Sequence, residues 1–268
     1  MNPFVFSCIT PHGGEIIPEL SGALPERMHL TRSSMQNIGK KMQAANPDVI
    51  IVLTPHGTRI DGMFSISHSE KMSGILEEHG ATYEMTRDVD RELAAAITEA
   101  AQNKGIPAAS INFGAAAGPA SQLRLDWGVI VPLAFMPHVP IVVINPSREL
   151  PFDQHMRFGQ VISQSVQKSE KRVALIASCD WSHAHDLDGP YGFHPAAKAL
   201  DEEVIHYMKN NELEKLADLD PDYIEAAKPD GIWQTIILAG AIPAASRRIQ
   251  FLSYEVPTYF GLICAEVQ

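Results

Sequence analysis

Residues 46–57 read Asn-Pro-Asp-Val-Ile-Ile-Val-Leu-Thr-Pro-His-Gly, an apolar run that ends abruptly in a polar segment. Five consecutive apolar residues, Val49–Leu53, predict a strand buried on both faces, because four of the five are β-branched. Pro55 cannot donate a hydrogen bond to a central ladder, so His56 should lie just past the end of the strand. In open α/β sheets ligands bind at that edge. We therefore expect His56 in a functional loop.

The same order of features occurs twice more along the chain. Residues 4–9 form a largely apolar run that leads into Thr-Pro-His-Gly-Gly at 10–14, which contains His12. Residues 173–177 form another apolar run, which leads into residues 178–185 and contributes His183 and His185. The carboxyl ends of parallel strands meet at one edge of a sheet, so we expect these histidine loops to converge on one site.

Strand and helix patterns alternate along the rest of the chain. Helical spacing of apolar residues predicts helices over 31–45, 88–103, 152–169, 195–210 and 233–242. Further strands are predicted over 63–68, 129–136, 140–146, 249–254 and 258–265, and a loop rich in small residues over 106–118. No element is assigned to 69–87. The alternation predicts a single-domain layered α/β fold with a central mixed or mostly parallel sheet flanked by helices.

Composition limits the class of protein. No linker, repeat or low-complexity tract divides the 268 residues, so we expect one catalytic domain over residues 1–268. The net charge of −11, with no basic stripe, argues against a nucleic-acid or anionic-membrane partner. There is no apolar run of about 20 residues and no signal-like N-terminus, which predicts a soluble, cytoplasmic protein. Three cysteines without a CxxC pair indicate neither a disulfide framework nor a thiolate zinc site.

His12 and His56 are the strongest candidates for metal ligands. Each follows a proline and precedes a glycine at the end of an apolar strand, a context that leaves room for a ligand to approach. Neutral imidazoles suit first-row metals, and two histidines with one carboxylate are typical of non-haem Fe(II) sites that activate oxygen. We expect the two histidines to share one ion.

Four short motifs follow one another along nearly the whole chain. They are Pro11-His12-Gly13-Gly14, Thr54-Pro55-His56-Gly57, Asp126-x-Gly128 before Val131-Pro132-Leu133, and Ser178-x-Asp180-x-Ser182-His183. Together they resemble the catalytic (B) subunit of the class III extradiol ring-cleavage dioxygenases. Each motif is short, but their order and their positions at strand ends carry the resemblance.

The resemblance implies Fe(II) held by His12, His56 and a late carboxylate, with His183 as the acid/base. The carboxylate has two candidates near the late helix that ends in Gly-Ala: Asp230, which precedes Gly231, and Glu225 in reserve. Asp230 could equally be the N-cap of the helix beginning near Trp233, and the sequence leaves these alternatives open.

Several neighbouring residues extend the hypothesis. His185 is a second catalytic candidate, which would orient His183 or bind the substrate, although an exposed loop position is an equal alternative. Trp127 stands where many relatives have histidine, which makes it a candidate for shaping the substrate pocket. A pocket role is considered for His194. Cys179 is interpreted as a small buried residue beside the site.

The resemblance implies cleavage of the aromatic ring of a catechol-type substrate by O₂, beside one hydroxyl, with both oxygen atoms retained. The expected partners are a small aromatic diol and O₂, and a homo-oligomer is expected. The sequence leaves open whether a small second subunit is required, as in some relatives. Zinc and manganese are the alternative metals. Two rival interpretations remain: a zinc or other divalent-metal hydrolase on the same scaffold, and a non-catalytic member that binds a metal or a partner.

Overall fold

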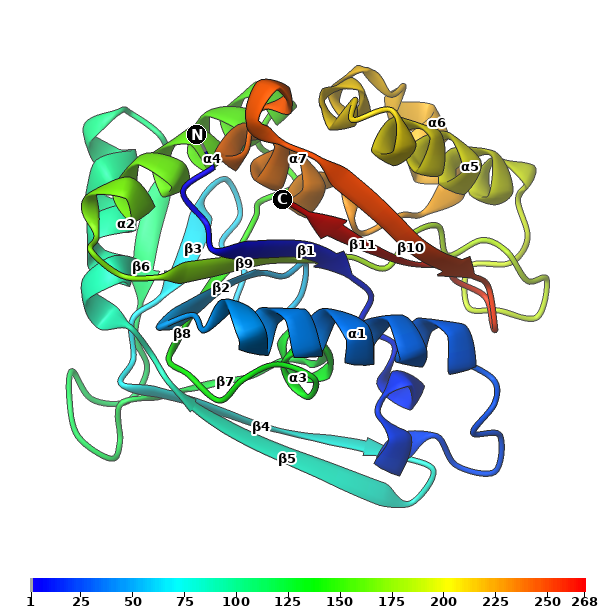
Figure 1. The fold of residues 1–268 in the computed structure, drawn as a ribbon, viewed down its shortest axis with the longest axis horizontal. Helices are drawn as coiled ribbons and strands as arrows, with labels where there is room; N and C mark the ends of the chain where they lie inside the picture. Colours follow the sequence, from blue (N-terminus) through cyan, green and yellow to red (C-terminus); the bar gives the residue numbers. More distant parts are fainter. Residues whose placement is uncertain (1) are drawn as a thin grey trace.

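The strand predicted from residues 49–53 lies inside an eight-stranded sheet, with all five side chains buried. In the computed structural model, which describes residues 2–268, the strand order is β10-β11-β1-β9-β2-β8-β3-β6 (Figure 1). These strands are β1 (Phe6–Thr10), β2 (Val49–Leu53), β3 (Phe64–Ser67), β6 (Ala108–Ile111), β8 (Ile141–Asn145), β9 (Val173–Ser178), β10 (Ile249–Glu255) and β11 (Leu262–Val267). The adjacent strands β1, β9, β2 and β8 pair in parallel. Their carboxyl ends therefore share one edge.

Helices cover both faces of this sheet (Figure 1). They are α1 (His29–Ala45), α2 (Arg91–Asn103), α3 (Trp127–Leu133), α4 (Phe152–Lys168), α5 (Pro195–Lys209), α6 (Pro221–Ala227) and α7 (Ile232–Ala241). Short 3₁₀ helices form at Gly14–Ile16, Pro18–Leu20, Leu213–Asp218 and Ala244–Ser246. The mixed sheet between helical layers confirms the predicted α/β fold.

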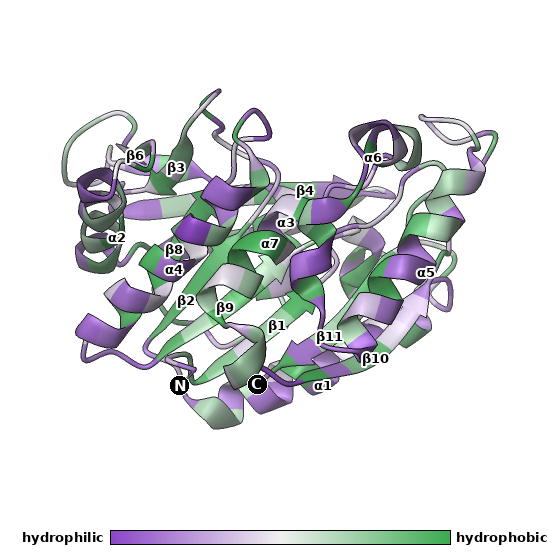
Figure 2. Cartoon of the chain, turned by 90° about the horizontal axis from the view of Figure 1, so that it is seen from above, coloured by the Kyte–Doolittle hydropathy of each residue, from purple (hydrophilic) through white to green (hydrophobic). Residues whose placement is uncertain are grey.

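The alternation of side chains along β2 explains the two layers. Ile51 and Leu53 pack in one apolar cluster with α2, α4, α5 and α7, whereas Ile50 and Val52 pack in another with α1 and α3. Successive strand side chains point to opposite faces, so a continuous apolar run supplies both clusters. Figure 2 shows the apolar strands between helices whose outer surfaces are more polar.

A second, smaller sheet lies outside the layer of α1 and α3 (Figure 1). Its strands, β4 (Lys71–Glu78), β5 (Ala81–Asp88) and β7 (Gln122–Arg124), are arranged in the order β5-β4-β7. Strands β4 and β5 form an antiparallel hairpin, which occupies the segment 69–87 to which the sequence analysis assigned no element. Its strands are partly exposed on both sides and alternate weakly, which left no clear pattern to read.

Three other predictions were wrong in part. Residues 129–136 were predicted as a strand, but Val129–Leu133 belong to helix α3, because a short apolar run does not distinguish a buried helix from a strand. Strand β6 occupies part of the predicted loop 106–118. Residue Asp88 ends β5, and α2 begins only at Arg91, with Asp90 as N-cap accepting a hydrogen bond from the Leu93 amide.

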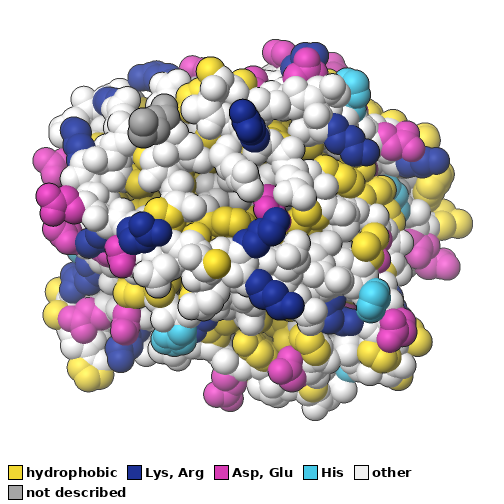
Figure 3. Space-filling view, in the orientation of Figure 1, with side chains coloured by type: hydrophobic (Ala, Val, Ile, Leu, Met, Phe, Trp, Pro, Cys, Tyr) yellow, Lys and Arg dark blue, Asp and Glu magenta, His cyan; other side chains and the backbone are white. Residues whose placement is uncertain are grey.

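Acidic residues outnumber basic ones in the sequence, 32 against 21. On the face in Figure 3, lysine and arginine side chains are interspersed with aspartate and glutamate. The three cysteines are buried and free. None of the helices within residues 2–268 combines the length and apolar character needed to cross a bilayer.

Candidate metal centre

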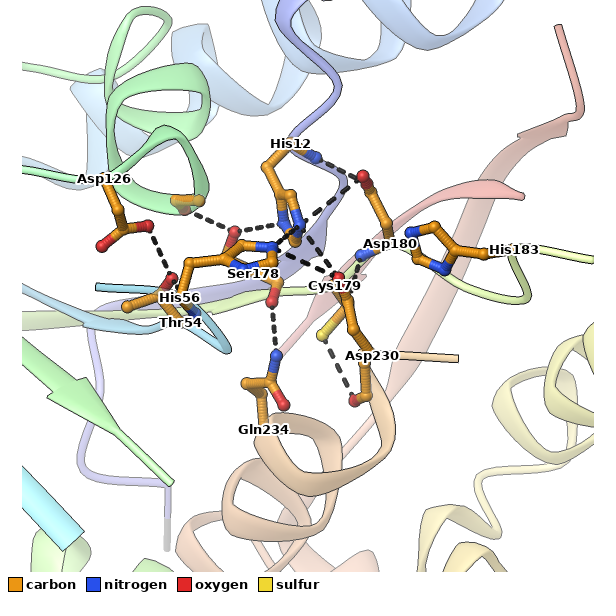
Figure 4. A network of polar contacts seen from close by, with 12 residues as sticks. His12, Thr54, His56, Asp126, Ser178, Cys179, Asp180, His183, Asp230 and Gln234 are labelled. Atoms are coloured by element: carbon orange, nitrogen blue, oxygen red, sulfur yellow. Dashed lines mark hydrogen bonds and ion pairs between the residues drawn. The ribbon is translucent and has the colours of Figure 1, made fainter. Parts of the chain in front are cut away.

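The histidine loops converge at the carboxyl edge of the parallel strands, as the sequence predicted (Figure 4). His12 follows β1 and His56 follows β2, and their Nε2 atoms are 3.1 Å apart. Asp230 reaches the same point from the segment before α7, with Oδ2 at 3.2 Å from His12 Nε2 and 3.4 Å from His56 Nε2. Three donor atoms from distant parts of the chain thus meet at one point.

The separations between these donors fit a shared divalent ion. Ligands at about 2.1 Å from one ion lie about 3.0 Å apart in octahedral geometry and about 3.4 Å apart in tetrahedral geometry. The three observed separations, 3.1, 3.2 and 3.4 Å, span this interval. Two imidazole nitrogens and one carboxylate oxygen form a donor set suited to a first-row metal. The residues present therefore fit such an ion.

Hydrogen bonding fixes His12 in the tautomer that can bind a metal ion through Nε2. The Ser178 hydroxyl donates to the Gly128 carbonyl at 2.5 Å, so its oxygen is left to accept. It lies 2.9 Å from His12 Nδ1, which must then carry the hydrogen and donate it. That tautomer leaves the His12 Nε2 lone pair directed at the donor cluster, the outer hydrogen bonding expected of a metal-bound histidine.

Asp230 does not cap the helix that follows it. The N-cap of α7 is Gly231, with no hydrogen bond from a capping side chain. Asp230 Oδ1 instead accepts from the Asp180 amide at 3.0 Å, which directs Oδ2 towards the two histidines. The capping alternative is therefore wrong. Glu225 lies exposed on α6 and pairs with Lys228, outside the donor group formed by His12, His56 and Asp230.

The electrostatics of the cluster favour a positive charge at its centre. Burial disfavours charged His12, but the carboxylates of Asp180 and Asp230 outweigh it and raise the pKa of His12 to about 9. Burial would raise the pKa of Asp230, yet His12, His56 and His183 hold it well below the usual value. Burial keeps the pKa of Asp180 above the usual value. A divalent cation would supply the positive charge that a proton on His12 otherwise provides.

His183 lies outside the donor triad but lines the same cavity of about 660 Å³. Its Nδ1 donates to the Lys228 carbonyl at 2.8 Å, which leaves the Nε2 lone pair without a protein partner within residues 2–268. Its ring stacks on Phe260, with centroids 5.5 Å apart. The cavity is also lined by His12, Gly13, Gly14, Glu15, Met28, His56, Glu78, His79, Trp127, Asp180, Pro190, Tyr191, Thr258, Tyr259 and Phe260.

The remaining candidates have different surroundings. His185 Nε2 donates to buried Asp201 Oδ2 at 2.9 Å, and His185 does not line the cavity. His194 caps α5, where its side chain accepts from the Ala196 amide. Cys179 is buried beside the site, as predicted. Trp127 lines the cavity and lies against His56, with ring centroids 4.1 Å apart.

Two buried carboxylates were present in the sequence motifs but received no role. Asp180 accepts from the His12 amide at 2.8 Å and holds the His12 loop. Asp126 accepts from the Thr54 hydroxyl at 3.0 Å, and the same hydroxyl accepts from the His56 amide at 3.3 Å. Their positions at strand ends, within Asp-x-Gly and Ser-x-Asp, were the signal that could have identified both.

Fold and site together define an α/β protein with a buried two-histidine, one-carboxylate donor set at the carboxyl edge of its sheet. Residues 7–263 match the family model of the catalytic LigB subunit of aromatic ring-opening dioxygenase. The chain belongs to this family, which confirms the resemblance inferred from the motifs.

Two relatives place the chain among similar proteins. It is 27% identical over 252 residues to Protein CA_C1420 of Clostridium acetobutylicum, covering 92% of this chain and 54% of that protein. The chain thus spans about half the length of that curated relative. The crystal structure of uncharacterized protein JW3007 from Escherichia coli K12 superposes with a TM-score of 0.65 at 14% identity, covering 98% of this chain and 99% of that one. At this identity the likeness shows the fold alone.

Proposed function

We propose that this protein is a non-haem Fe(II)-dependent extradiol dioxygenase that opens the ring of a small catechol-type substrate with O₂, acting through one catalytic domain over residues 1–268. The observation that carries the proposal is the convergence of His12 Nε2, His56 Nε2 and Asp230 Oδ2 at one point, beside the cavity that His12, His56 and His183 line. Membership of the ring-opening dioxygenase family supports the same reaction class.

In this proposal His12, His56 and Asp230 hold the ion. Ferrous iron would supply the redox chemistry by which a diol and dioxygen, held in contact, react. Three protein ligands leave positions open for both reactants. Ser178, Asp180 and Thr54 keep the two histidine loops in place through the hydrogen bonds described above.

His183 acts as the acid/base. Its Nδ1–H is held by the Lys228 carbonyl, so Nε2 is the atom available to take a proton from the substrate hydroxyl. The same nitrogen then returns a proton as the ring opens to a semialdehyde-type product. Stacking on Phe260 restricts rotation of the imidazole and so maintains this direction.

Aromatic side chains orient the substrate. Trp127, Tyr191, Tyr259 and Phe260 line the cavity, and a planar ring can stack on such faces. The volume of about 660 Å³ lies within the range of roughly 300 to 1,000 Å³ common for small-molecule sites. A single-ring diol therefore fits with space left for a substituent.

The test is metal loading followed by a catechol panel. Metal-free protein is loaded separately with Fe²⁺, Mn²⁺ and Zn²⁺ under nitrogen, and oxygen is then admitted with each catechol. We expect oxygen uptake and a yellow ring-opened product with Fe²⁺, and none with Zn²⁺. Hydrolysis of ester or amide substrates by the Zn²⁺ form alone would favour the hydrolase interpretation. Tight metal binding without either activity would favour a non-catalytic member.

A homo-oligomer remains a prediction, and a small second subunit remains an open alternative. Size-exclusion chromatography with light scattering measures the first, and activity of the purified chain alone tests the need for the second.

A further inference from the structure

The β4–β5 hairpin brings an acidic side chain to the wall of the cavity. Glu78 ends β4 and, with His79, lines the same cavity as His12 and His183. His79 and Gly80 form a two-residue turn with φ of 52° and 78°, the pair of positive angles that suits the twist of a tight hairpin. A Cβ added to Gly22 would lie 2.7 Å from the His79 ring, so the hairpin tip packs closely on the segment after the 3₁₀ helix Pro18–Leu20. The position of Glu78 is therefore set by tertiary packing.

The Glu78 carboxylate lies against the His12 loop. A Cβ on Gly14 would overlap both carboxylate oxygens, so glycine at this position makes room for the charge. Within residues 2–268, the side chains of Arg27 and His79 pair with Glu15 rather than with Glu78. Glu78 is half-buried, and its carboxylate has no hydrogen bond or ion pair from the described residues.

The carboxylate of Glu15 lies close to that of Glu78 and adds a second negative charge. Glu15, Glu78 and His79 each offer an atom within 4.8 Å of the others. Glu15 Oε1 is paired with Arg27 at 3.0 Å and His79 at 3.3 Å, while its Oε2 is buried without a hydrogen bond. Burial and the charge of Glu15 raise the pKa of Glu78, and His79 acts in the opposite direction. The local field is thus negative.

The part of the cavity beside Glu78 is lined by no permanently charged cationic side chain from the described residues. None of its lining residues in the described chain is lysine or arginine. The nearby Arg148 lines a different cavity, where its guanidinium lies 4.4 Å from the centre of the Trp233 ring. The walls beside Glu78 include Tyr259 and Phe260, whose faces attract an organic cation.

We propose that Glu78 is a specificity-determining residue that binds an ammonium group on a short side chain of the aromatic diol, so that cationic catechols are the preferred substrate class. This inference rests on the proposed function. A carboxylate-bearing diol would meet Glu15 and Glu78 and be disfavoured by like-charge repulsion.

The experiment compares three diols of similar size: 4-(2-aminoethyl)catechol, 4-ethylcatechol and 3-(3,4-dihydroxyphenyl)propionate. With Fe²⁺-loaded protein we expect kcat/KM for the ammonium compound to exceed that for the ethyl compound by about 10-fold, as for one charge-assisted hydrogen bond. The carboxylate compound should be the poorest. Glu78→Gln should bring the first two within about 2-fold. Glu77→Gln is the matched control, because it removes the same charge from the adjacent, exposed position of β4.

Equilibrium binding gives a readout that needs no turnover. Calorimetry under nitrogen should give the same order of affinities and the same loss of preference in Glu78→Gln. A preference in binding without ring cleavage would leave the inference standing and contradict the proposed function. Ring cleavage without a preference would contradict the inference alone.

Three results would overturn the inference. They are no detectable binding of the ammonium compound, a preference that survives Glu78→Gln, and two tightly bound equivalents of Mn²⁺ in the wild type that fall to one in Glu78→Gln. The last result would make Glu15, Glu78 and His79 a separate metal site.

Discussion

The cavity has two walls that are built in different ways. The metal wall consists of His12 and His56, which line the cavity, and of Asp230 beside them. Its residues follow buried strands or precede α7, and backbone amides direct its loops. The hairpin wall, Glu78 and His79, comes from the separate small sheet and is partly exposed. A change of side chain on the hairpin wall disturbs no strand of the main sheet. In our two proposals, reaction chemistry and substrate choice therefore depend on separate elements.

The largest expected effect is on the metal wall. Asp230→Asn should lower metal affinity by more than about 100-fold, beyond the range seen when only an outer partner of a ligand is lost. Helix α7 should stay folded, because Asp230 does not cap it. Metal content after dialysis measures the effect, and Glu225→Gln, on exposed α6, is the control that should keep its metal. Full occupancy in Asp230→Asn would remove Asp230 from the ligand set.

The second prediction distinguishes metal binding from proton transfer. His183→Ala should keep its metal and still bind a catechol, but turn over about 10²- to 10⁴-fold more slowly, as when a positioned acid/base is lost. Metal content and kcat are measured on the same preparation. His185→Ala should change kcat far less, because His185 pairs with Asp201 outside the cavity. Loss of metal in His183→Ala would indicate a three-histidine centre and favour zinc chemistry.

A third, smaller effect concerns the support of the metal wall. Ser178→Ala removes the acceptor that fixes the His12 tautomer, so metal affinity should fall by about 10- to 100-fold. Competition with a chelator measures this change. Ser182→Ala, a nearby buried serine whose hydroxyl has no partner in the described chain, should leave metal affinity unchanged. Equal losses in both variants would argue against the tautomer role.

The smallest expected effect concerns Glu78 on the hairpin wall. In Gly14→Ala the new methyl group competes with the Glu78 carboxylate, which can swing aside because it is the end of a flexible side chain. The protein should therefore fold and keep its metal, and only its preference for the ammonium compound should fall, by less than about 10-fold. Metal content and the ratio of kcat/KM for the ammonium compound to that for the ethyl compound are measured on the same preparation. A change in metal content with no change in this ratio would contradict the prediction.

The metal wall could be predicted from the sequence because its residues follow local patterns. An apolar run ended by Pro-His places His12 and His56 at the sheet edge, and parallel pairing then brings them together. From the sequence, the proposed ligand role of Asp230 could not be separated from a capping role, since both use a carboxylate just before a helix. Its contact with the Asp180 amide depends on tertiary structure.

The hairpin wall could not be predicted. Strands β4 and β5 are partly exposed on both faces, so their apolar residues do not alternate cleanly. Their turn uses His79-Gly80, not the Asn-Gly or Asp-Gly pairs that signal a tight hairpin. The contact of Glu78 with Gly14 joins residues far apart in sequence, and only the folded chain brings them together.

We propose that the metal wall supports insertion of both atoms of dioxygen into an aromatic diol. The most direct measurement is mass spectrometry of the product formed by Fe²⁺-loaded protein under ¹⁸O-labelled dioxygen, with Asp230→Asn as the metal-wall control. We predict a ring-opened product that carries both labelled atoms, formed by the wild type and not by the variant. A ring-opened product whose added oxygen comes from water, or a diol left intact, would contradict the account.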